Sequence, residues 1–548
     1  MFNFLDSIMD KDEQAELFTP IQSPKLPKRV QALSTAIPVD YNYISSYING
    51  FMAHQSESLK ALKNNTIGQV SLPTGTGKTR VQIGIHLTKM QELHKAGKSG
   101  VFVIGAHRLA LCSQLMDEML EIVVNTGIPF DVLTIGSHTY DRENVDKLNS
   151  SLNRHTSNVT STLNSQEVLN AYEKAIANGR MLICVSTYHS FNRLHLIPNI
   201  DICTYDEAHT LVTDAVESRF LDNISLIQPK INFNFFFTAT RKVQGLNEGM
   251  NNVERFGELL IEIPPKRMVE DGVIIPPKIH RLNAVEFGDY TNDTMYIKSV
   301  IEGYKKHKEF VQSHCNWLGS KLLISTNGNQ QMFVLHNAET FINFCKSNKI
   351  EVFAFSSQEG CYHNFEKKSR SYVMAQMDSL DDEVDAILLH IDILTEGIDL
   401  PSITGVMPFR ELNDIKLLQT IGRGTRLLKN DRERLINKEI KPTKFDTYHK
   451  PYCWVIFPEY LSTTGNVKAM TDTIHLIMDQ YEVPVTELVV NDSYLAQKVE
   501  SLDSITESVT INRRDDESDI IHIVEDVWVE KMSHFSLSNI ISKLKGKT

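Results

Sequence analysis

The feature that most constrains this chain is the segment LPTGTGKT at residues 72–79, which lies between a short apolar run and a helical pattern. Gly75 and Gly77 let the backbone turn tightly, so that several amides and the start of a helix can point at one anion. Lys78 adds a positive charge for the terminal phosphates, and Thr79 adds a hydroxyl suited to Mg²⁺. A phosphate-binding loop is therefore predicted, although the strict pattern has glycine at position 72. We expect it to bind a nucleoside triphosphate and Mg²⁺ through Thr74, Gly75, Thr76, Gly77, Lys78 and Thr79.

The acidic pair Asp206 and Glu207 directly follows the apolar run at residues 200–205. Both carboxylates then lie at the carboxyl end of a predicted strand, where α/β sheets bind their ligands. Asp206 is suited to hold Mg²⁺ through its water shell, and Glu207 to orient and deprotonate a water that attacks the phosphate. Alone, the pair could be a solvated acidic turn. Downstream of a phosphate loop, it predicts the second half of a nucleotide-hydrolysing site.

Apolar runs that alternate with helical patterns determine the expected fold class. The strand candidates lie at residues 67–72, 101–105, 181–186, 200–205 and 234–238, and then at 321–326, 351–355, 386–390 and 453–457. This alternation predicts parallel α/β sheets. Proline pairs at 264–265 and 276–277 indicate a boundary between two such regions. With 548 residues, the chain has room for about three domains of roughly 150 residues each.

The predicted division has four parts. They are an N-terminal extension at 1–50, a first α/β domain at 51–265, a second at 266–460 and an accessory region at 461–548. The polar stretch at 137–170 has few apolar anchors. We therefore expect that stretch to be a surface excursion rather than a domain.

The overall composition, 41% apolar and 23% charged, is that of a globular protein without an apolar run of about 18 residues that could cross a bilayer. The first residues lack the pattern of a signal peptide. We therefore expect a cytoplasmic protein without a membrane partner, whose seven scattered cysteines are reduced and mostly buried. The net charge of −12 argues against coating nucleic acid through overall charge. Any contact with nucleic acid then has to be a local groove.

Together, these segments resemble a superfamily 2 helicase, in the DEAH-box branch that includes the motor subunits of type I and type III restriction enzymes. The matching segments are 72–79 (motif I), AHRLALCSQ at 106–114 (motif Ia), STYHS at 186–190, DEAH at 206–209 (motif II), TAT at 238–240 (motif III), LTEGIDLP at 394–401 (motif V) and QTIGRGTR at 419–426 (motif VI). Residues 268–279 also resemble the linker that restriction-type motors carry between their two domains. The motif IV region at 321–336 is a strand followed by polar residues, and the adenine-contacting element is reduced to residues 53–55.

The resemblance implies two tandem RecA-like parallel-sheet domains with a small C-terminal accessory region. It also implies that Gln419, Arg423 and Arg426 act on ATP from the second domain. On a helix, Gln419 and Arg423 share a face, and Arg426 follows one turn further along. The other implied residues are Gln55, Gly397 and Asp399 for ATP, Arg108, Ser186, Thr187 and Thr395 for nucleic acid, and His209, Thr238 and Thr240 for coupling.

The leading hypothesis is an ATP-dependent helicase or translocase whose partner is DNA rather than RNA. An RNA helicase is an alternative, because RNA-remodelling DEAH proteins share Gln419 and His209 at these motif positions. An ATP-switched binding or assembly protein is another, in which the C-terminal region at 462–548 recruits a protein partner. A restriction motor subunit is a further possibility, but the nuclease-like triplet at 439–441 lacks a metal-binding Asp on a preceding strand and is expected to be a charged loop.

Overall fold

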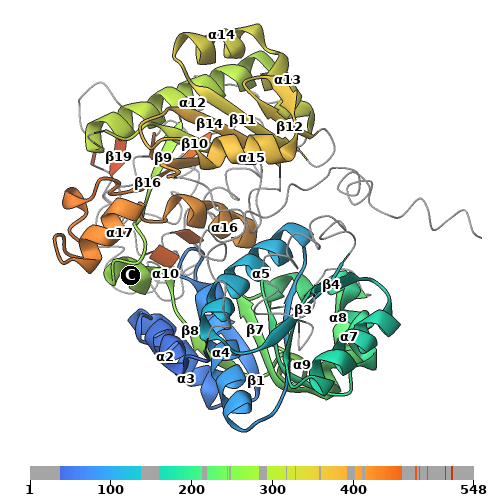
Figure 1. Cartoon of the computed structure of the whole chain (residues 1–548). Helices are drawn as coiled ribbons and strands as arrows, with labels where there is room; N and C mark the ends of the chain where they lie inside the picture. Colours follow the sequence, from blue (N-terminus) through green and yellow to red (C-terminus); the bar gives the residue numbers. More distant parts are fainter. Residues whose placement is uncertain are drawn as a thin grey trace, which may run out of the picture. The chain divides into compact units, whose positions relative to one another are not determined.

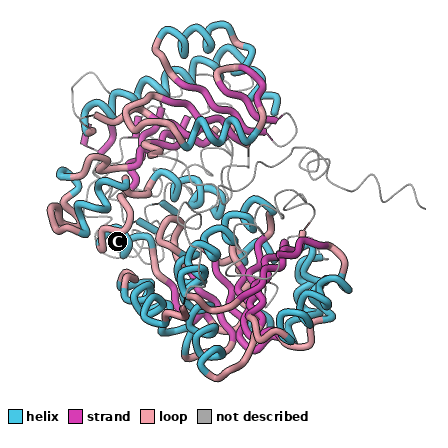
Figure 2. Tube along the Cα trace, in the orientation of Figure 1, coloured by secondary structure: helices cyan, strands magenta, loops and turns pink. Residues whose placement is uncertain are grey.

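The computed structural model describes residues 38–136, 159–212, 219–243, 245, 249–282, 293–315, 317–326, 329–356, 360–391, 402–409, 414–458 and short pieces between 476 and 522. Contacts divide the chain into two compact units, Met1–Ile263 and Pro264–Thr548. Each unit contains one eight-stranded sheet, visible in Figures 1 and 2. Among the described helices, none has the length and apolarity needed to cross a membrane.

The sheet of the first unit has the order β4-β3-β5-β2-β6-β7-β1-β8, and every neighbouring pair is parallel. Its strands are β1 (Ile67–Ser71), β2 (Val101–Ala106), β3 (Phe130–Ile135), β4 (Val159–Thr162), β5 (Met181–Thr187), β6 (Ile200–Tyr205), β7 (Ile231–Thr238) and β8 (Leu259–Glu262). Because all strands run the same way, their carboxyl ends meet at one edge of the sheet. The phosphate loop after β1 and the acidic pair after β6 both lie at that edge.

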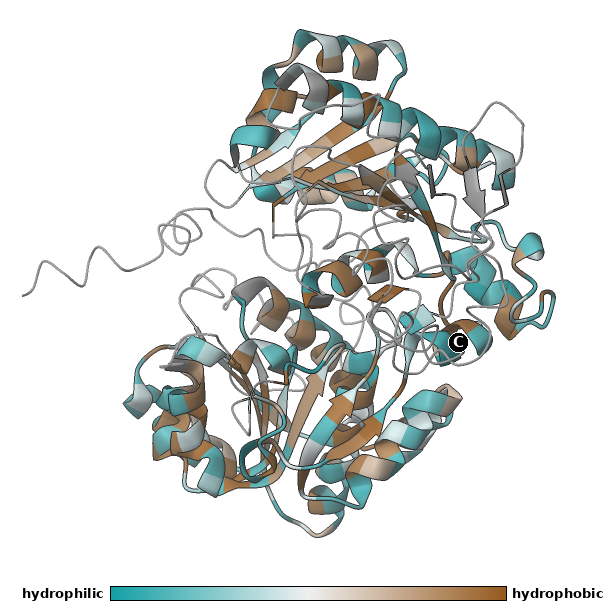
Figure 3. Ribbon diagram, turned by 180° about the vertical axis from the view of Figure 1, so that it is seen from behind, coloured by the Kyte–Doolittle hydropathy of each residue, from teal (hydrophilic) through white to brown (hydrophobic). Residues whose placement is uncertain are grey.

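Helices cover both faces of this sheet, whose strands are mostly hydrophobic in Figure 3. On one face lie α7 (Ser165–Ala177), the 3₁₀ segment η3 (Tyr188–Leu196) and α8 (Arg219–Ile227), which share an apolar core with Val101 and Val103 of β2. On the other face, α4 (Lys78–Lys95) packs on β6, and α5 (Leu109–Val123) packs on β2 and β5. The short helices α2 (Tyr41–Asn49), α3 (Ala53–Lys63) and α9 (Val253–Phe256) also belong to this unit. Elements on both faces can therefore reach the carboxyl edge.

The sheet of the second unit has the order β13-β12-β11-β14-β10-β15-β16-β9. Its strands are β9 (Pro277–Leu282), β10 (Lys321–Ser325), β11 (Glu351–Ser356), β12 (Gly360–His363), β13 (Glu366–Lys368), β14 (Ala386–His390), β15 (Gly405–Pro408) and β16 (Cys453–Pro458). All pairs are parallel except those that join β11, β12 and β13. Pro277 begins the edge strand β9, where proline is tolerated because an edge needs fewer ladder bonds.

In the described part of the second unit, the α-helices are α10 (Pro265–Glu270), α12 (Asp293–His314), α13 (Asn329–Asn337), α14 (Glu339–Ser347), α15 (Arg370–Asp378), α16 (Asp414–Gly424) and α17 (Lys429–Ile436). One core joins α12, α13 and α14 to the central strands. The helix α16 packs against β15 and β16. Three very short strands, β17 (Val490–Asn491), β18 (Asn512–Arg513) and β19 (Ile520–His522), form a separate small sheet.

The nine predicted strands are confirmed, seven of them with ends that differ from the prediction by one to three residues. The fold class is confirmed as α/β with two parallel-strand sheets. The seven cysteines are free and buried, as expected. One expectation is wrong in part: residues 159–170 are not a surface excursion, because β4 extends the sheet and α7 begins at Ser165. Residues 137–158 of that stretch lie outside the described residues, and the four-part division of the chain stays a prediction.

Candidate functional site

The phosphate loop leaves β1 and enters α4 with two left-handed glycines. Gly75 and Gly77 have φ angles of 83° and 86°, which residues other than glycine rarely adopt. A Cβ on Gly77 would lie 2.4 Å from the Gln55 Nε2 atom, so glycine is needed there for space as well. The Thr76 hydroxyl donates to the Pro73 carbonyl (2.7 Å), which ties the loop to its own start. The loop is thus held in a bend that opens directly onto the first turn of α4.

Helix α3 supports this loop from outside. The Gln55 side chain accepts from the Met52 amide (3.1 Å) and donates to the Thr76 carbonyl (3.0 Å). The His54 Nε2 atom lies 2.9 Å from the same carbonyl. Gln55 therefore lies beside the phosphate loop with its side-chain amide bonded to protein backbone, and its assignment to ATP stays a prediction.

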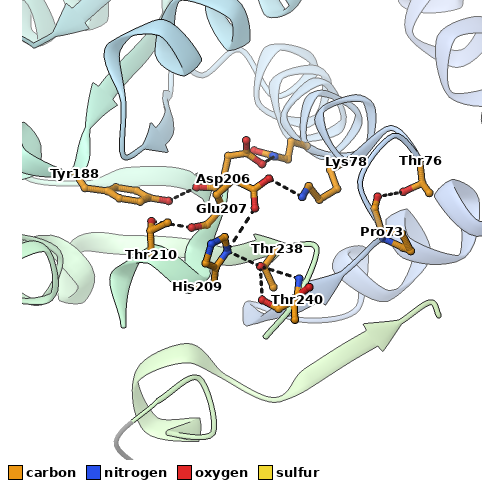
Figure 4. A network of polar contacts seen from close by, with 11 residues as sticks. Pro73, Thr76, Lys78, Tyr188, Asp206, Glu207, His209, Thr210, Thr238 and Thr240 are labelled. Carbon is orange, nitrogen blue, oxygen red and sulfur yellow. Dashed lines mark hydrogen bonds and ion pairs between the residues drawn. The ribbon is translucent and has the colours of Figure 1, made fainter. Parts of the chain in front are cut away.

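The centre of the site is an ion pair between Lys78 and Glu207, shown in Figure 4. The Lys78 Nζ atom lies 2.8 Å from Glu207 Oε1, and both side chains are about nine-tenths buried. Glu207 has a φ of 49°, an unusual left-handed conformation for this residue type. Such outliers concentrate at functional sites, where the surrounding structure maintains them. The two residues that the sequence assigned to phosphate binding and water activation are therefore in direct contact.

Asp206 is fixed from three directions. Its amide donates to the Gly105 carbonyl on β2 (2.8 Å), its carbonyl accepts from the Tyr188 hydroxyl (2.5 Å), and its Oδ1 atom accepts from Gln82 Nε2 (2.8 Å). Burial and the neighbouring Glu207 raise the pKa of Asp206 to about 6, against opposing effects of Lys78 and Gln82. A divalent cation would lower the cost of burying these carboxylates and the repulsion between them, because it offsets their charge. Asp206 and the hydroxyl of Thr79, at the start of α4, thus fit the expected Mg²⁺.

A row of polar side chains on α4 connects the helix to β6. Lys78, Gln82 and His86 follow one another at intervals of four residues and so share a helix face. The His86 Nε2 atom lies 2.9 Å from the Thr204 hydroxyl, two residues before Asp206 on β6. Burial lowers the pKa of His86 to about 3, so the ring is neutral. The sequence reading missed Gln82, although this four-residue spacing in an otherwise apolar segment indicates it.

A second chain of contacts leads from Glu207 toward the end of β7. The His209 Nδ1 atom lies 3.4 Å from Glu207 Oε2 and 3.0 Å from the Thr238 hydroxyl. The Thr238 hydroxyl donates its one proton to the Thr240 carbonyl (2.8 Å) and accepts from the Thr240 amide (3.2 Å). His209 must therefore donate from Nδ1 to Thr238. The three expected coupling residues lie together in one network (Figure 4).

The residues expected to touch nucleic acid differ in exposure. Arg108 is exposed at the residue before α5. Ser186 is fully buried and its hydroxyl donates to the Thr187 carbonyl (3.0 Å), while the Thr187 hydroxyl donates to Ser190 (3.2 Å). His189, next along the chain, is exposed. Arg108 and His189 therefore lie at the surface, whereas Ser186 and Thr187 are buried. Thr395 lies outside the described residues.

In the second unit, Gln419 and Arg423 lie on α16 and are both buried. Among the residues that the structure describes, neither amide atom of Gln419 has a hydrogen-bond partner. The prediction that Arg426 continues this helix by one more turn is wrong, because α16 ends at Gly424. The Arg426 backbone instead forms a bridge with Ile274, and the Ile275 amide donates to Thr425 (2.9 Å). The linker-like segment therefore sets the position of Arg426. Gly397 and Asp399 lie outside the described residues.

Lys450 fixes the end of α16. Its ammonium group is buried and donates to the carbonyls of Gly424 (3.0 Å) and Ile403 (2.9 Å). Burial lowers the pKa of Lys450 to about 8. The two carbonyls satisfy a charge that would otherwise be costly to bury. No signal in the sequence distinguished this lysine from an exposed one.

Comparisons with known proteins agree with this architecture. Residues 47–243 match the family model of the type III restriction enzyme res subunit. No curated protein matches the sequence. The solved structure of the ATP-dependent Type ISP restriction-modification enzyme LlaBIII bound to DNA gives a TM-score of 0.54 at 15% identity, over 82% of this chain and 30% of that one. The DEAD-box helicase Mss116 bound to ssRNA and UDP-BeF gives 0.47 at 13% identity, over 85% of each chain. This chain thus spans less than a third of the Type ISP enzyme, and it has the tandem RecA-like fold.

Proposed function

We propose that this chain is a superfamily 2 helicase of the restriction-enzyme motor type, and that it uses ATP to move along DNA as a translocase or helicase. The observation that carries the proposal is the continuous network from Lys78 through Glu207 and His209 to Thr238. A nucleotide that rearranges the first residue of such a network also perturbs the last one. This is what coupling hydrolysis to movement requires.

The chemistry that we propose uses the residues already described. Lys78 leaves Glu207 for the terminal phosphates of ATP, and Glu207 is then available to accept a proton from the attacking water. Thr79 and Asp206 would hold Mg²⁺, which would neutralise phosphate charge. Gln419, Arg423 and Arg426 of the second unit, together with Gly397 and Asp399, are assigned to ATP by resemblance. An arginine supplied in this way can accelerate phosphoryl transfer by about three to five orders of magnitude.

DNA is favoured as the track because the matched family model describes the res subunit of type III restriction enzymes and because LlaBIII was solved bound to DNA. The proposed contacts are Arg108, Thr187 and Thr395, with Ser186 in a supporting role. Backbone contacts of this kind do not read base identity, so movement independent of sequence is expected. The region 461–548 is proposed as an accessory region that could bind a protein partner, and a cytoplasmic location stays a prediction.

Strand displacement tests the proposal. The wild-type chain should separate a labelled DNA strand from its complement only with ATP and Mg²⁺, and Lys78→Ala should abolish the separation. Lys95→Ala is the matched control, because Lys95 is exposed in the last turn of the same helix. ATP hydrolysis without strand separation, and without displacement of a bound protein from duplex DNA, would indicate an ATP-controlled switch instead. Displacement restricted to RNA would indicate the alternative track.

A further inference from the structure

We propose that Tyr188 is a positioning residue, which fixes the backbone of Asp206 and links it to the segment at residues 186–190. This inference rests on the proposed function, because it assigns to that segment a part in stimulating hydrolysis. It concerns the first unit alone. The residue belongs to none of the groups assigned above to ATP, Mg²⁺, nucleic acid or the His209 network.

The contact itself is direct and buried. The Tyr188 hydroxyl donates to the carbonyl oxygen of Asp206 over 2.5 Å (Figure 4). Burial, with Asp206 nearby, raises the pKa of Tyr188 well above its ordinary value, so the hydroxyl remains a donor at neutral pH. The carboxylate of Asp206 is bonded on the opposite face of the sheet by Gln82. Tyr188 and Gln82 therefore hold the same residue from two sides, one through its backbone and the other through its side chain.

To make this contact, the tyrosine ring has to cross a strand. Tyr188 follows β5, Asp206 follows β6, and β2 lies between them. The crossing occurs at Gly105 of β2, where a Cβ would lie 3.1 Å from the Tyr188 ring and 2.4 Å from the Phe191 ring. Real Cβ atoms essentially never come as close as the second distance. The glycine thus leaves the space through which the ring reaches the acidic pair.

The start of η3 is also tied to the outside of the unit. The Asn223 side chain of α8 donates to the carbonyls of Tyr188 and His189, each over 3.1 Å. The exposed His189 ring packs edge-on against Phe220 of the same helix, with ring centroids 4.5 Å apart. A backbone held at both of these points moves as one piece. A ligand that shifts the segment at His189 therefore shifts Tyr188, and with it the carbonyl of Asp206.

The sequence supplies a matched pair of variants. Tyr188→Phe removes only the hydroxyl and keeps the ring. The ring centroid lies 5.8 Å from that of Phe191 and 5.9 Å from that of Phe220. Tyr205→Phe removes a hydroxyl from an equally buried ring in the same cluster. The Tyr205 hydroxyl has no oxygen or nitrogen partner in the described part of the chain and lies beside the Cys203 thiol. The two changes have the same chemistry and differ in whether Asp206 loses a donor.

The experiment measures ATP hydrolysis by the full chain, with and without DNA and across a Mg²⁺ titration. For Tyr188→Phe we expect the DNA-stimulated rate to fall relative to the unstimulated rate by about threefold to tenfold, as the loss of one buried hydrogen bond allows. The Mg²⁺ concentration for half-maximal rate should rise, while the KM for ATP at saturating Mg²⁺ stays within about twofold. Tyr205→Phe should match the wild type in all three. Thermal melting of each variant separates these effects from loss of folded protein.

Asn223→Ala tests the link to η3 separately, because it removes the two hydrogen bonds at the start of η3 and leaves Tyr188 and Asp206 unchanged. It should lower the DNA stimulation and leave the Mg²⁺ requirement unchanged. Equal stimulation and equal Mg²⁺ requirement in Tyr188→Phe and Tyr205→Phe would overturn the inference. A wild-type chain that hydrolyses ATP but responds to no nucleic acid would count against the proposed function, and the Mg²⁺ titration would then still decide whether Tyr188 positions Asp206.

Discussion

At the scale of single residues, the ion pair between Lys78 and Glu207 is the contact on which the proposed chemistry depends. The same carboxylate that should activate water is bonded to the ammonium group that should bind phosphate. One contact has to break before either residue can act. Under the proposed function, the pair would link nucleotide binding to the release of the base and would limit premature hydrolysis of a loosely bound nucleotide.

Changing Glu207 to glutamine tests this link. The amide cannot take the proton from water, so kcat for ATP hydrolysis should fall roughly 100-fold or more. ATP binding should persist or tighten, because Lys78 no longer has a charged partner to leave. Fluorescent-nucleotide titration and steady-state hydrolysis measure the two effects separately. Glu92→Gln, an exposed position on α4, is the control, and loss of nucleotide binding in Glu207→Gln would contradict the assigned role.

Asp117 on α5 gives a prediction about pH. Burial, with Glu118 beside it, raises the pKa of Asp117 from 3.8 to about 7 in the folded chain. The folded state then binds more protons than the unfolded state between these values, so this group lowers stability as pH rises from about 4 to about 7. Asp117→Asn should raise the melting temperature of the first unit by several degrees at about pH 8 and leave it unchanged near pH 4. An equal shift at both pH values would contradict this account.

At the scale of elements, the end of α16 has little tolerance for change. A Cβ on Gly424 would lie 2.2 Å from the Cys453 Sγ atom of β16. Lys450 bonds the carbonyl of the same glycine, and the bridge from Ile274 to Arg426 follows two residues later. Three contacts thus constrain the three residues from Gly424 to Arg426. Small residues are needed there so that the helix can pack closely on its strand.

A double-mutant cycle tests this packing. Gly424→Ala should destabilise the second unit by about 1–3 kcal/mol, the usual cost of overpacking. Cys453→Ala removes the sulfur that the new methyl group would meet, so the double variant should recover part of the loss. Denaturant unfolding of the wild type, the two single variants and the double variant gives the coupling free energy. It should be at least about 0.5 kcal/mol for residues in contact. Strict additivity would show that the two positions do not meet as the structure has them.

Much of the two sheets was predictable from the sequence, because buried parallel strands are continuous apolar runs such as residues 181–186 and 386–390. The strands that were not predicted are short or polar, among them β4 with the sequence VTST and β15 with GVMP. Lys78, Asp206 and Glu207 were predictable because their spacing follows from the loop and the strand end. The contacts of Tyr188 and Lys450 were not, because they join segments whose proximity depends on strand order rather than on sequence distance.

At the scale of the whole molecule, each unit carries part of one expected machine. The first unit contains the phosphate loop, the acidic pair and the network to Thr238, and the second contains Gln419, Arg423 and Arg426. The net charge of −12 disfavours a surface that binds nucleic acid everywhere. The account therefore predicts a motor whose hydrolysis responds to nucleic acid through a few local contacts, and not a constitutive ATPase.

The most direct test of that claim is the rate of ATP hydrolysis with single-stranded DNA, duplex DNA, RNA or no nucleic acid, each at several salt concentrations. Lys78→Ala sets the background rate. The account predicts that DNA raises the rate several-fold over the rate without nucleic acid, and that the stimulation weakens as salt rises, because phosphate contacts are screened. A rate that no nucleic acid changes would contradict the central claim, and stimulation by RNA alone would contradict the assignment of DNA as the track.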